Sequence, residues 1–201
     1  MNSVPYEVLM GCPFSIYEAV VGATYPKVDE TPTGDWTKVG SNLNFSEDGL
    51  TFDHPQTITK YRSAGDCGTR KVDRTEEDLI IKAVLNDLRA QAYALALNGN
   101  SVTPTPAGPG VAGVDTVGLS RGFGVKTVAL LIRADFSPEM EMGAMQYEVP
   151  IAAQTGSSTV AFKKGAAAGL SLEWTALVDP DATSDDERFG RLVIQTDVAE
   201  S

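Results

Sequence analysis

The sequence predicts a mainly β protein with one short α-helix, an α+β fold. Across most of the 201 residues, short segments alternate apolar and polar side chains with a period of two, which is typical of half-buried strands. A single segment at residues 88–97, LRAQAYALAL, consists instead of good helix formers. With 42% apolar residues the chain can bury a sizeable core, and its length favours one domain over residues 1–201.

The first quarter of the chain predicts short strands joined by turns. Residues 6–22 predict two strands, and residues 26–34 predict a loop because Pro, Thr, Asp and Gly dominate there. Trp36 and Val39 are expected to anchor the turn-rich segment that follows. Asp48-Gly49 predicts a hairpin or a tight turn.

Residues 50–62 and 75–86 each alternate, and we expect them to form two long antiparallel strands joined by the loop 63–73, the central part of an extended loop at residues 60–74. Pro55 has no N–H, so the first strand is expected to be bulged or to lie at an edge there. The polar faces of both strands should lie on one side of the hairpin. These faces hold Thr51, Asp53, Thr57, Thr59, Glu76, Asp78 and Lys82.

The helix is expected to follow the second of these strands directly. Asp87 is placed to cap its first turn, and Gly99 is placed to end it with a positive φ. Because apolar side chains lie on both sides of this helix, we expect both sides to be covered.

Beyond the helix, residues 101–113 are rich in Pro and Gly, which predicts an exposed loop or arm without a regular element. The rest of the chain predicts more β structure. The expected strands are residues 116–121, 126–134, 147–152, 159–163, 170–178 and 191–197.

Charge and composition exclude several classes of protein. The net charge is −11 and the pI is about 4.5, so we expect the chain to repel DNA and anionic membranes rather than bind them. No apolar run approaches the ~20 residues of a membrane span, and no secretory signal is visible, so we expect synthesis and folding in the cytoplasm. Cys12 and Cys67 predict isolated thiols, with a disulfide as the alternative.

Two motifs match the letters of functional patterns but lack their structural context, and a third only resembles such a pattern. GLSRG at 118–122 matches a nucleophile elbow, but a loop and a strand follow it, and the one histidine, His54, lies upstream on the inward face of a predicted strand. GPGVAG at 108–113 lacks the strand and helix of a phosphate-binding turn. DPDATSDDE at 179–187 lacks the Gly and Glu of a calcium loop, which leaves a solvated acidic turn or a weak cation site. We therefore expect no enzyme activity, no catalytic residue, no cofactor and no assigned metal site.

Two charge clusters remain. The basic one comprises Lys60, Arg62, Arg70, Lys71 and Arg74. The acidic one comprises Asp179, Asp181, Asp185, Asp186 and Glu187. Either both are solvated loops, or the basic loop of one copy meets the acidic turn of another.

The order of several motifs resembles the major tail tube proteins of long-tailed bacteriophages. The motifs are WTKVG at 36–40, SEDGLT at 46–51, RTEE at 74–77 before a strand, the helix ending in Asn98-Gly99, and LEWTALVDP at 172–180 in a β-rich second half. The resemblance spans roughly residues 36–198, and the 101–113 loop departs from it.

This resemblance implies a β-sandwich or half-barrel flanked by one helix, with sheets completed across subunits. Six copies would close into a ring, and rings would stack into a virion tail tube that delivers DNA without binding it specifically. The implied partners are the chain itself, a tape-measure protein and tail-end proteins. Open sheet edges in a polar hairpin fit such self-assembly.

Two hypotheses about residues follow. The polar set of the hairpin (Thr51, Asp53, Thr57, Thr59, Glu76, Asp78 and Lys82) would line the bore, where an acidic wall lets phosphates pass. The two charge clusters would form a contact between subunits. The alternatives are another virion or secretion-apparatus structural component, such as a tail-end or decoration module, and a small-ligand binder or hydrolase.

Overall fold

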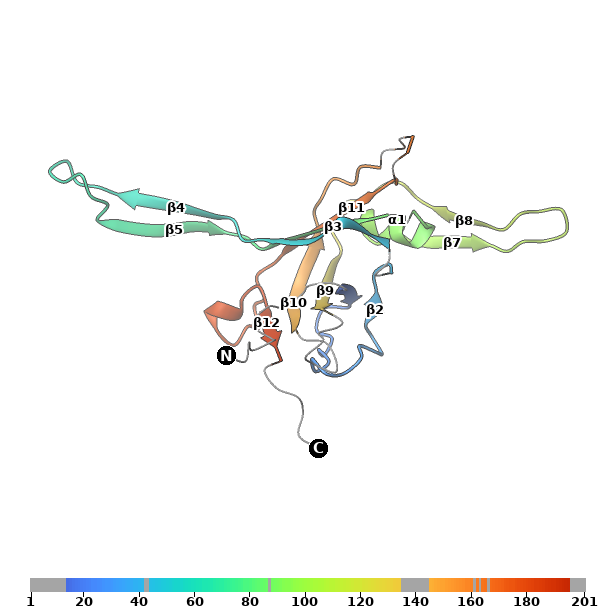
Figure 1. Ribbon diagram of the computed structural model, residues 1–201, viewed down its shortest axis with the longest axis horizontal. Coiled ribbons are helices and arrows are strands. Elements are labelled where there is room, and N and C mark those ends of the chain that lie inside the picture. Colours follow the sequence, from blue (N-terminus) through green and yellow to red (C-terminus); the bar gives the residue numbers. More distant parts are fainter. Residues whose placement is uncertain are drawn as a thin grey trace, which may run out of the picture.

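The structure, a computed structural model, describes residues 14–41, 44–86, 88–134, 145–160, 162, 164–165 and 167–195 (Figure 1). Its centre is an eight-stranded antiparallel sheet with the order β2-β1-β9-β10-β11-β6-β3, and β12 pairs with β10 beside this path. These strands are β1 (Phe14–Ala19), β2 (Thr37–Lys38), β3 (Phe45–Asp53), β6 (Ile80–Leu85), β9 (Thr127–Ala134), β10 (Met145–Gln154), β11 (Leu170–Ala176) and β12 (Arg191–Ile194).

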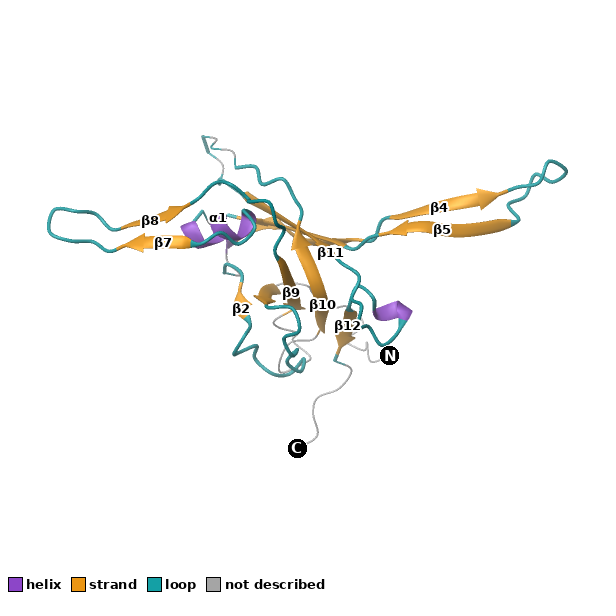
Figure 2. Cartoon of the chain, turned by 180° about the vertical axis from the view of Figure 1, so that it is seen from behind, coloured by secondary structure: helices purple, strands orange, loops and turns teal. Residues whose placement is uncertain are grey.

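Two further pairs of strands leave this sheet as hairpins. The first pairs β4 (Gln56–Tyr61) with β5 (Lys71–Glu77), and the second pairs β7 (Val102–Thr105) with β8 (Val114–Val117). They extend from opposite sides of the central body (Figure 1; Figure 2 gives the reverse view). The described part of the chain contains one α-helix, α1 (Ala90–Ala96), and a 3-10 turn, η3 (Asp185–Glu187). The predicted mainly β fold with one short helix is confirmed.

The core lies on one face of the sheet. Every second residue of the central strands is buried there, as the period-two pattern predicts, and Ile81, Leu130 and Trp174 are 0–1% exposed. Helix α1 packs on the same core through Ala92, Tyr93 and Ala96, among others. The buried alternation of β6 and β11 matches the expectation for these two segments.

The sheet curls around this core. Phe14 of β1 contacts Phe45 of β3, with ring centroids 4.8 Å apart, although β9, β10, β11 and β6 separate the two strands in the sheet order. Phe52 of β3 also stacks on Tyr147 of β10, with centroids 3.9 Å apart. Strands from the two ends of the sheet therefore face each other across the apolar interior.

The opposite face of the sheet has two zones. Over β1 and β9 it is covered by the chain between residues 20 and 36, where Trp36 is buried against Ala129 and Leu131. The indole N–H of Trp36 donates to the carbonyl oxygen of Thr24 at 2.9 Å. Trp36 and Val39 are both buried, so their predicted anchoring role is confirmed. Over β11, β6 and β3 the same face is mostly polar, with Ile80 and Val84 of β6 as apolar exceptions.

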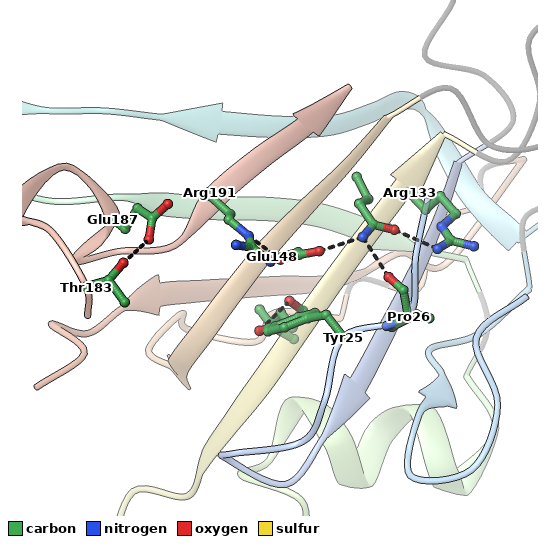
Figure 3. A network of polar contacts seen from close by, with 9 residues as sticks. Tyr25, Pro26, Arg133, Glu148, Thr183, Glu187 and Arg191 are labelled. Carbon is green, nitrogen blue, oxygen red and sulfur yellow. Dashed lines mark hydrogen bonds and ion pairs between the residues drawn. The ribbon is translucent and has the colours of Figure 1, made fainter. Parts of the chain in front are cut away.

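A buried polar network holds the 20–36 segment against the sheet (Figure 3). Arg133 donates to Gln146 Oε1 at 2.6 Å and to backbone carbonyl oxygens of that segment, and Gln146 donates to Glu148 Oε1 at 2.6 Å. Arg191 closes the network by donating to Glu148 Oε2 at 2.6 Å, and this bond raises the pKa of Arg191. Because Arg133, Gln146 and Glu148 each form hydrogen bonds in this network, it fixes the position of the segment on the sheet.

The two long strands predicted for the hairpin are each interrupted. Residues 50–62 divide into β3 and β4 at His54-Pro55, and residues 75–86 divide into β5 and β6 at Asp78-Leu79. Pro55 cannot donate to a ladder, and its carbonyl oxygen instead accepts the N–H of Asp78 at 3.1 Å. The expected pairing is correct on both sides of this break, between β3 and β6 and between β4 and β5.

Several local predictions are wrong. Asp48-Gly49 does not reverse the chain; it lies inside β3, where the register shifts and Gly49 takes a φ of 70°. Helix α1 begins at Ala90, with Arg89 as N-cap and no side-chain cap, and the proposed cap Asp87 lies outside the described residues. At the other end of the helix, Gly99 has the predicted positive φ, 69°.

The Pro/Gly-rich segment 101–113 contains a regular element, contrary to expectation. Its first residues form β7, because a two-stranded ribbon tolerates Pro104 at a free edge. Residues 118–121 of the predicted strand 116–121 form no strand, and the described residues 159, 160 and 162 form none either. Residues 6–13, including Cys12, and residues 196–197 lie outside the described residues, whereas Cys67 is an exposed free thiol.

Candidate assembly surfaces

The polar zone of the sheet places Thr51 directly opposite Lys82 across the β3–β6 ladder. Lys82 Nζ lies 2.7 Å from Asp53 Oδ2, and this hydrogen bond raises the pKa of Lys82. Glu173 of β11 pairs with Lys82 on the other side of β6. We call this surface the polar sheet face. The apolar side chains of Ile80 and Val84 lie on it beside Lys82, and its polar residues are Thr51, Asp53, Lys82, Ser171, Glu173 and Thr175.

The last three of these residues were missed by the sequence-based hypothesis. Their alternation with buried Leu172 and Trp174 was visible in the sequence. What the sequence lacked was the pairing of β11 with β6, which joins residues about ninety positions apart and brings Glu173 beside Lys82.

The remaining predicted bore residues lie on the β4–β5 hairpin, which we call the β4–β5 arm. Thr57 pairs with Glu76, and the Thr57 hydroxyl donates to the Glu76 carboxylate at 2.9 Å. Thr59 pairs with Asp73. Asp78 lies at the junction between arm and sheet. The structure thus divides the predicted polar set between two surfaces, and within each surface the paired polar side chains do share a side.

The β4–β5 arm has no core of its own. Ile58, Tyr61 and Val72 are 40%, 54% and 52% exposed, and no helix or second sheet covers either side in the described part of the chain. An isolated two-stranded hairpin is marginally stable in water, and both outer edges of this one carry unpaired backbone groups. The arm is therefore a surface that a partner would stabilise.

The arm carries all five residues of the predicted basic cluster, but they differ in their partners. Lys71 forms an ion pair with Asp73 at 3.0 Å, and Arg74 forms one with Glu77 at 3.0 Å. The side chains of Lys60, Arg62 and Arg70 form no ion pair with any described residue. These three side chains are therefore available to form ion pairs with another molecule.

The acidic cluster forms a compact turn around η3. The Asp179 carboxylate accepts the N–H of Asp181 at 3.0 Å, and Glu187 accepts the Thr183 hydroxyl at 2.8 Å. Asp185 and Asp186 are exposed. No ion pair among the described residues joins this turn to the β4–β5 arm, so the structure does not bring the two charge clusters together within one copy.

None of the motif matches has a catalytic or ligand-binding context. Ser120 of GLSRG lies in a loop before β9, and its Oγ accepts the N–H of Gly122 at 3.2 Å. His54 is exposed at the junction of β3 and β4, which corrects the inward placement expected for it. GPGVAG forms the turn between β7 and β8, and no helix follows it. Within the described ranges, no group of three or more His, Cys, Asp or Glu side chains is arranged to hold a metal ion.

No protein-family model matches the chain, and no curated protein matches its sequence. No helix in the described segments is long and apolar enough to cross a membrane.

Proposed function

We propose that this chain is a structural subunit that assembles into stacked rings, six copies to a ring, and forms the tail tube of a bacteriophage. In this role it is a virion protein without enzyme activity, and DNA passes through the tube during delivery. The observation that carries the proposal is the β4–β5 arm, which leaves one curled sheet without a core to support it, while the β7–β8 hairpin extends from the opposite side and is contacted by helix α1 (Figure 1).

Both hairpins favour self-assembly: among the described elements of one copy, the β4–β5 arm lacks substantial packing contacts, and the β7–β8 hairpin packs mainly against α1. Their backbone edges are open, and exposed Val and Ile side chains lie along them. Pairing or covering these ribbons with neighbouring copies removes the free edges. Repetition around a closed ring makes such contacts equivalent and prevents open-ended aggregation within the ring. The curled sheet fits the half-barrel that a tube subunit of this kind would have.

The polar sheet face would line the bore. Its one cation, Lys82, is paired with Asp53 and adjoins Glu173, so this surface offers no free positive charge to a phosphate backbone. Nonspecific binding of nucleic acid arises from phosphate neutralisation by cations, so a wall of this kind would let DNA slide. Thr57, Thr59 and Glu76 on the arm and Asp78 at its base would continue the same lining.

Stacking would bring the free cations of the arm to the acidic turn of a copy in the next ring. The sequence carries 27 acidic and 16 basic residues, so most of the surface is mutually repulsive between copies. A local contact of opposite sign therefore selects one docking geometry. Tape-measure and tail-end proteins would be the further partners of the assembled tube.

The first test is assembly of the full chain at increasing protein concentration. Sedimentation velocity should detect a shift from small species to rings, and negative-stain microscopy should detect rings or tubes with a central channel. Ile58→Lys with Val72→Lys, which places charge on the arm, should reduce assembly, whereas Ser157→Lys, at an exposed position outside the arms, should not. A chain that remains monomeric throughout would refute the proposal. Rings that never stack would instead indicate a tail-end component.

The bore is tested by cysteine accessibility in assembled tubes. Cysteines at Glu173 or Thr57, in a chain whose own Cys12 and Cys67 are replaced by Ser, should react with small maleimides but not with maleimides on large polymers. Cysteine at exposed Thr33, which belongs to neither the polar sheet face, the arms nor the charge clusters, serves as the comparison and should react with both reagents. Reaction of Glu173→Cys with the large reagent in intact tubes would place the polar sheet face outside the channel.

A further inference from the structure

The loop of residues 118–126 between β8 and β9 is held by two asparagines. The Asn98 amide donates to the carbonyl oxygens of Arg121 and Gly124 at 3.0 and 2.7 Å. Its oxygen accepts the N–H of Lys126 at 2.7 Å. Asn98 takes a φ of 75°, which Asn tolerates better than most residues, and this conformation aims its side chain at the loop.

Further hydrogen bonds complete the support of this loop. Asn100 donates to the carbonyl oxygens of Gly118 and Ser120 at 2.6 and 2.8 Å. Arg121 donates to Ser158, whose hydroxyl donates to the carbonyl oxygen of Ala96 at the end of α1. The loop is thus fastened to α1 and to the chain after β10.

This well-supported loop presents apolar side chains to solvent. Phe123 is completely exposed, and Leu119 and Val125 are 73% and 64% exposed. The fastening removes most of the conformational entropy that such a loop would otherwise lose on binding. A preorganised aromatic side chain with apolar neighbours is typical of an interface anchor. We call residues 118–126 the Phe123 loop.

A matching cavity lies elsewhere in the fold. It has a volume of about 510 Å³ and opens between β3 and the ends of β9 and β10. A cavity of roughly 150 Å³ already accommodates benzene, so this one has room for an aromatic ring and an aliphatic neighbour. Its apolar lining includes Phe14, Phe45, Leu50, Phe52, Ile132 and Tyr147.

Loop and cavity lie at opposite ends of one strand. The Phe123 loop ends where β9 begins, and the cavity is lined by Ile132 and Ala134 at the end of the same strand. At about 3.3 Å per residue, the eight residues of β9 hold them roughly 26 Å apart. The fastened loop therefore cannot fill the cavity of its own chain, and a contact between the two joins different copies head to tail.

We propose that Phe123 of one copy inserts into this cavity of a second copy. Charges on the two surfaces match, because the Phe123 loop carries Arg121 and Lys126 and no acid, while the cavity lining includes exposed Glu47 and Asp48 and its cation Arg133 is buried. This contact rests on the proposed self-assembly and assigns to it a head-to-tail anchor distinct from the hairpin arms. Each copy supplies one anchor and one cavity, so the contact propagates around a ring or along a stack.

Directed cross-linking tests the contact between chains. In a background with Cys12 and Cys67 replaced by Ser, Gly124→Cys and Leu50→Cys chains are mixed under assembly conditions and oxidised; Gly124 adjoins Phe123, and a Cβ there meets no atom within 4 Å. A disulfide-linked dimer should form in the mixture and in neither chain alone. Phe162→Cys, at a position outside the Phe123 loop that is 83% exposed, replaces Gly124→Cys as the control and should not link. Absence of the dimer, or equal linking by the control, overturns the proposal.

The energetic test compares variants by sedimentation. Phe123→Ala should raise the concentration at the midpoint of assembly by about tenfold or more, whereas Phe123→Trp and Phe162→Ala should leave it near the value of the unmodified chain. Normal assembly of Phe123→Ala would refute this contact and leave the tail-tube proposal standing. Failure of the unmodified chain to assemble would refute both.

A last variant tests whether another part of the same chain occupies the cavity. Leu50→Cys in a chain that keeps Cys12 reports whether the chain's own N-terminal residues enter the cavity. We expect no disulfide within one chain. Formation of a Cys12 disulfide with the introduced cysteine in monomers would overturn the proposal and assign the cavity to the residues before Phe14.

Discussion

The rings of Phe14 and Phe45 lie 4.8 Å apart at an angle of 42°, although their strands are separated by four others in the sheet. This contact links the two ends of the curled sheet directly. It also borders the cavity proposed to receive Phe123, because both rings line it. The curvature of the sheet and the shape of the cavity therefore depend on the same pair.

A double-mutant cycle measures how much the contact between Phe14 and Phe45 contributes to stability. Phe14→Ala and Phe45→Ala should each destabilise the chain, and their coupling energy should be about 0.5–1.5 kcal/mol, the range for tilted aromatic pairs. Urea denaturation followed by fluorescence provides the free energies. Phe14→Ala combined with Phe162→Ala is the control, and its effects should add. Additivity of the Phe14 and Phe45 substitutions would mean that the two rings do not stabilise the curl.

Gly190 allows β12 to begin against β10. It has a φ of 115°, and a Cβ built there would overlap the carbonyl oxygen of Glu148. We expect Gly190→Ala to destabilise the chain by about 3 kcal/mol through backbone strain and overpacking. Gly65→Ala, where a Cβ meets no atom within 4 Å, should change stability little. Thermal unfolding of both variants checks this, and equal melting temperatures would contradict it.

Glu18 should make stability fall as the pH rises. Burial raises the pKa of its carboxyl group, an effect partly offset by Lys126, and Glu18 Oε2 has no hydrogen-bond partner among the described residues. The folded chain then binds this proton more tightly than the unfolded chain, so stability declines as pH rises from about 4.3, the unfolded value, through the raised folded value. Glu18→Gln should flatten this decline in urea denaturation across pH, whereas Glu47→Gln, at an exposed position, should not.

Substitutions of Arg62 and Arg70 test the stacking contact most directly, because Lys71 and Arg74 already form ion pairs within the arm. Arg62→Glu with Arg70→Glu should block stacking, and adding Asp185→Lys with Asp186→Lys should restore it. Each exposed pair contributes only ~0–1 kcal/mol, so the effect requires repetition around a ring and should weaken in high salt. Microscopy of tube length provides the measurement. Tubes of normal length from Arg62→Glu with Arg70→Glu would show that the proposed stacking contact does not form.

Asp53 and Glu173 should keep the proposed bore from retaining polyanions. Replacing both with Asn and Gln leaves Lys82 without its acidic neighbours, and assembled tubes should then bind single-stranded DNA in a salt-sensitive way. Thr51→Val, on the same surface, is the uncharged control. Binding is measured by cosedimentation with labelled DNA. Equal retention by all three proteins would argue against an electrostatic role for this surface.

Local pattern predicted much of the fold. The alternation of β6 and β11, the presence of a strand at β9, the hairpin pairing around Pro55 and the positive φ of Gly99 were all readable from neighbouring residues. The helix start, the bulge at Gly49 and the strand β7 were not. In each case a backbone contact outside the segment decided the conformation, and local propensity was overridden.

The sequence by itself determined that this chain is β-rich, that it has one polar hairpin and that its basic and acidic charges are clustered apart. Those properties depend on residue type and short spacing. Only the tertiary structure decided that β11 lies beside β6, that the sheet curls until Phe14 meets Phe45, and that the Phe123 loop and its matching cavity occupy opposite ends of β9. Strand order and curvature arise from contacts between residues far apart in the chain, and a period-two pattern carries no information about which strand becomes the neighbour of another.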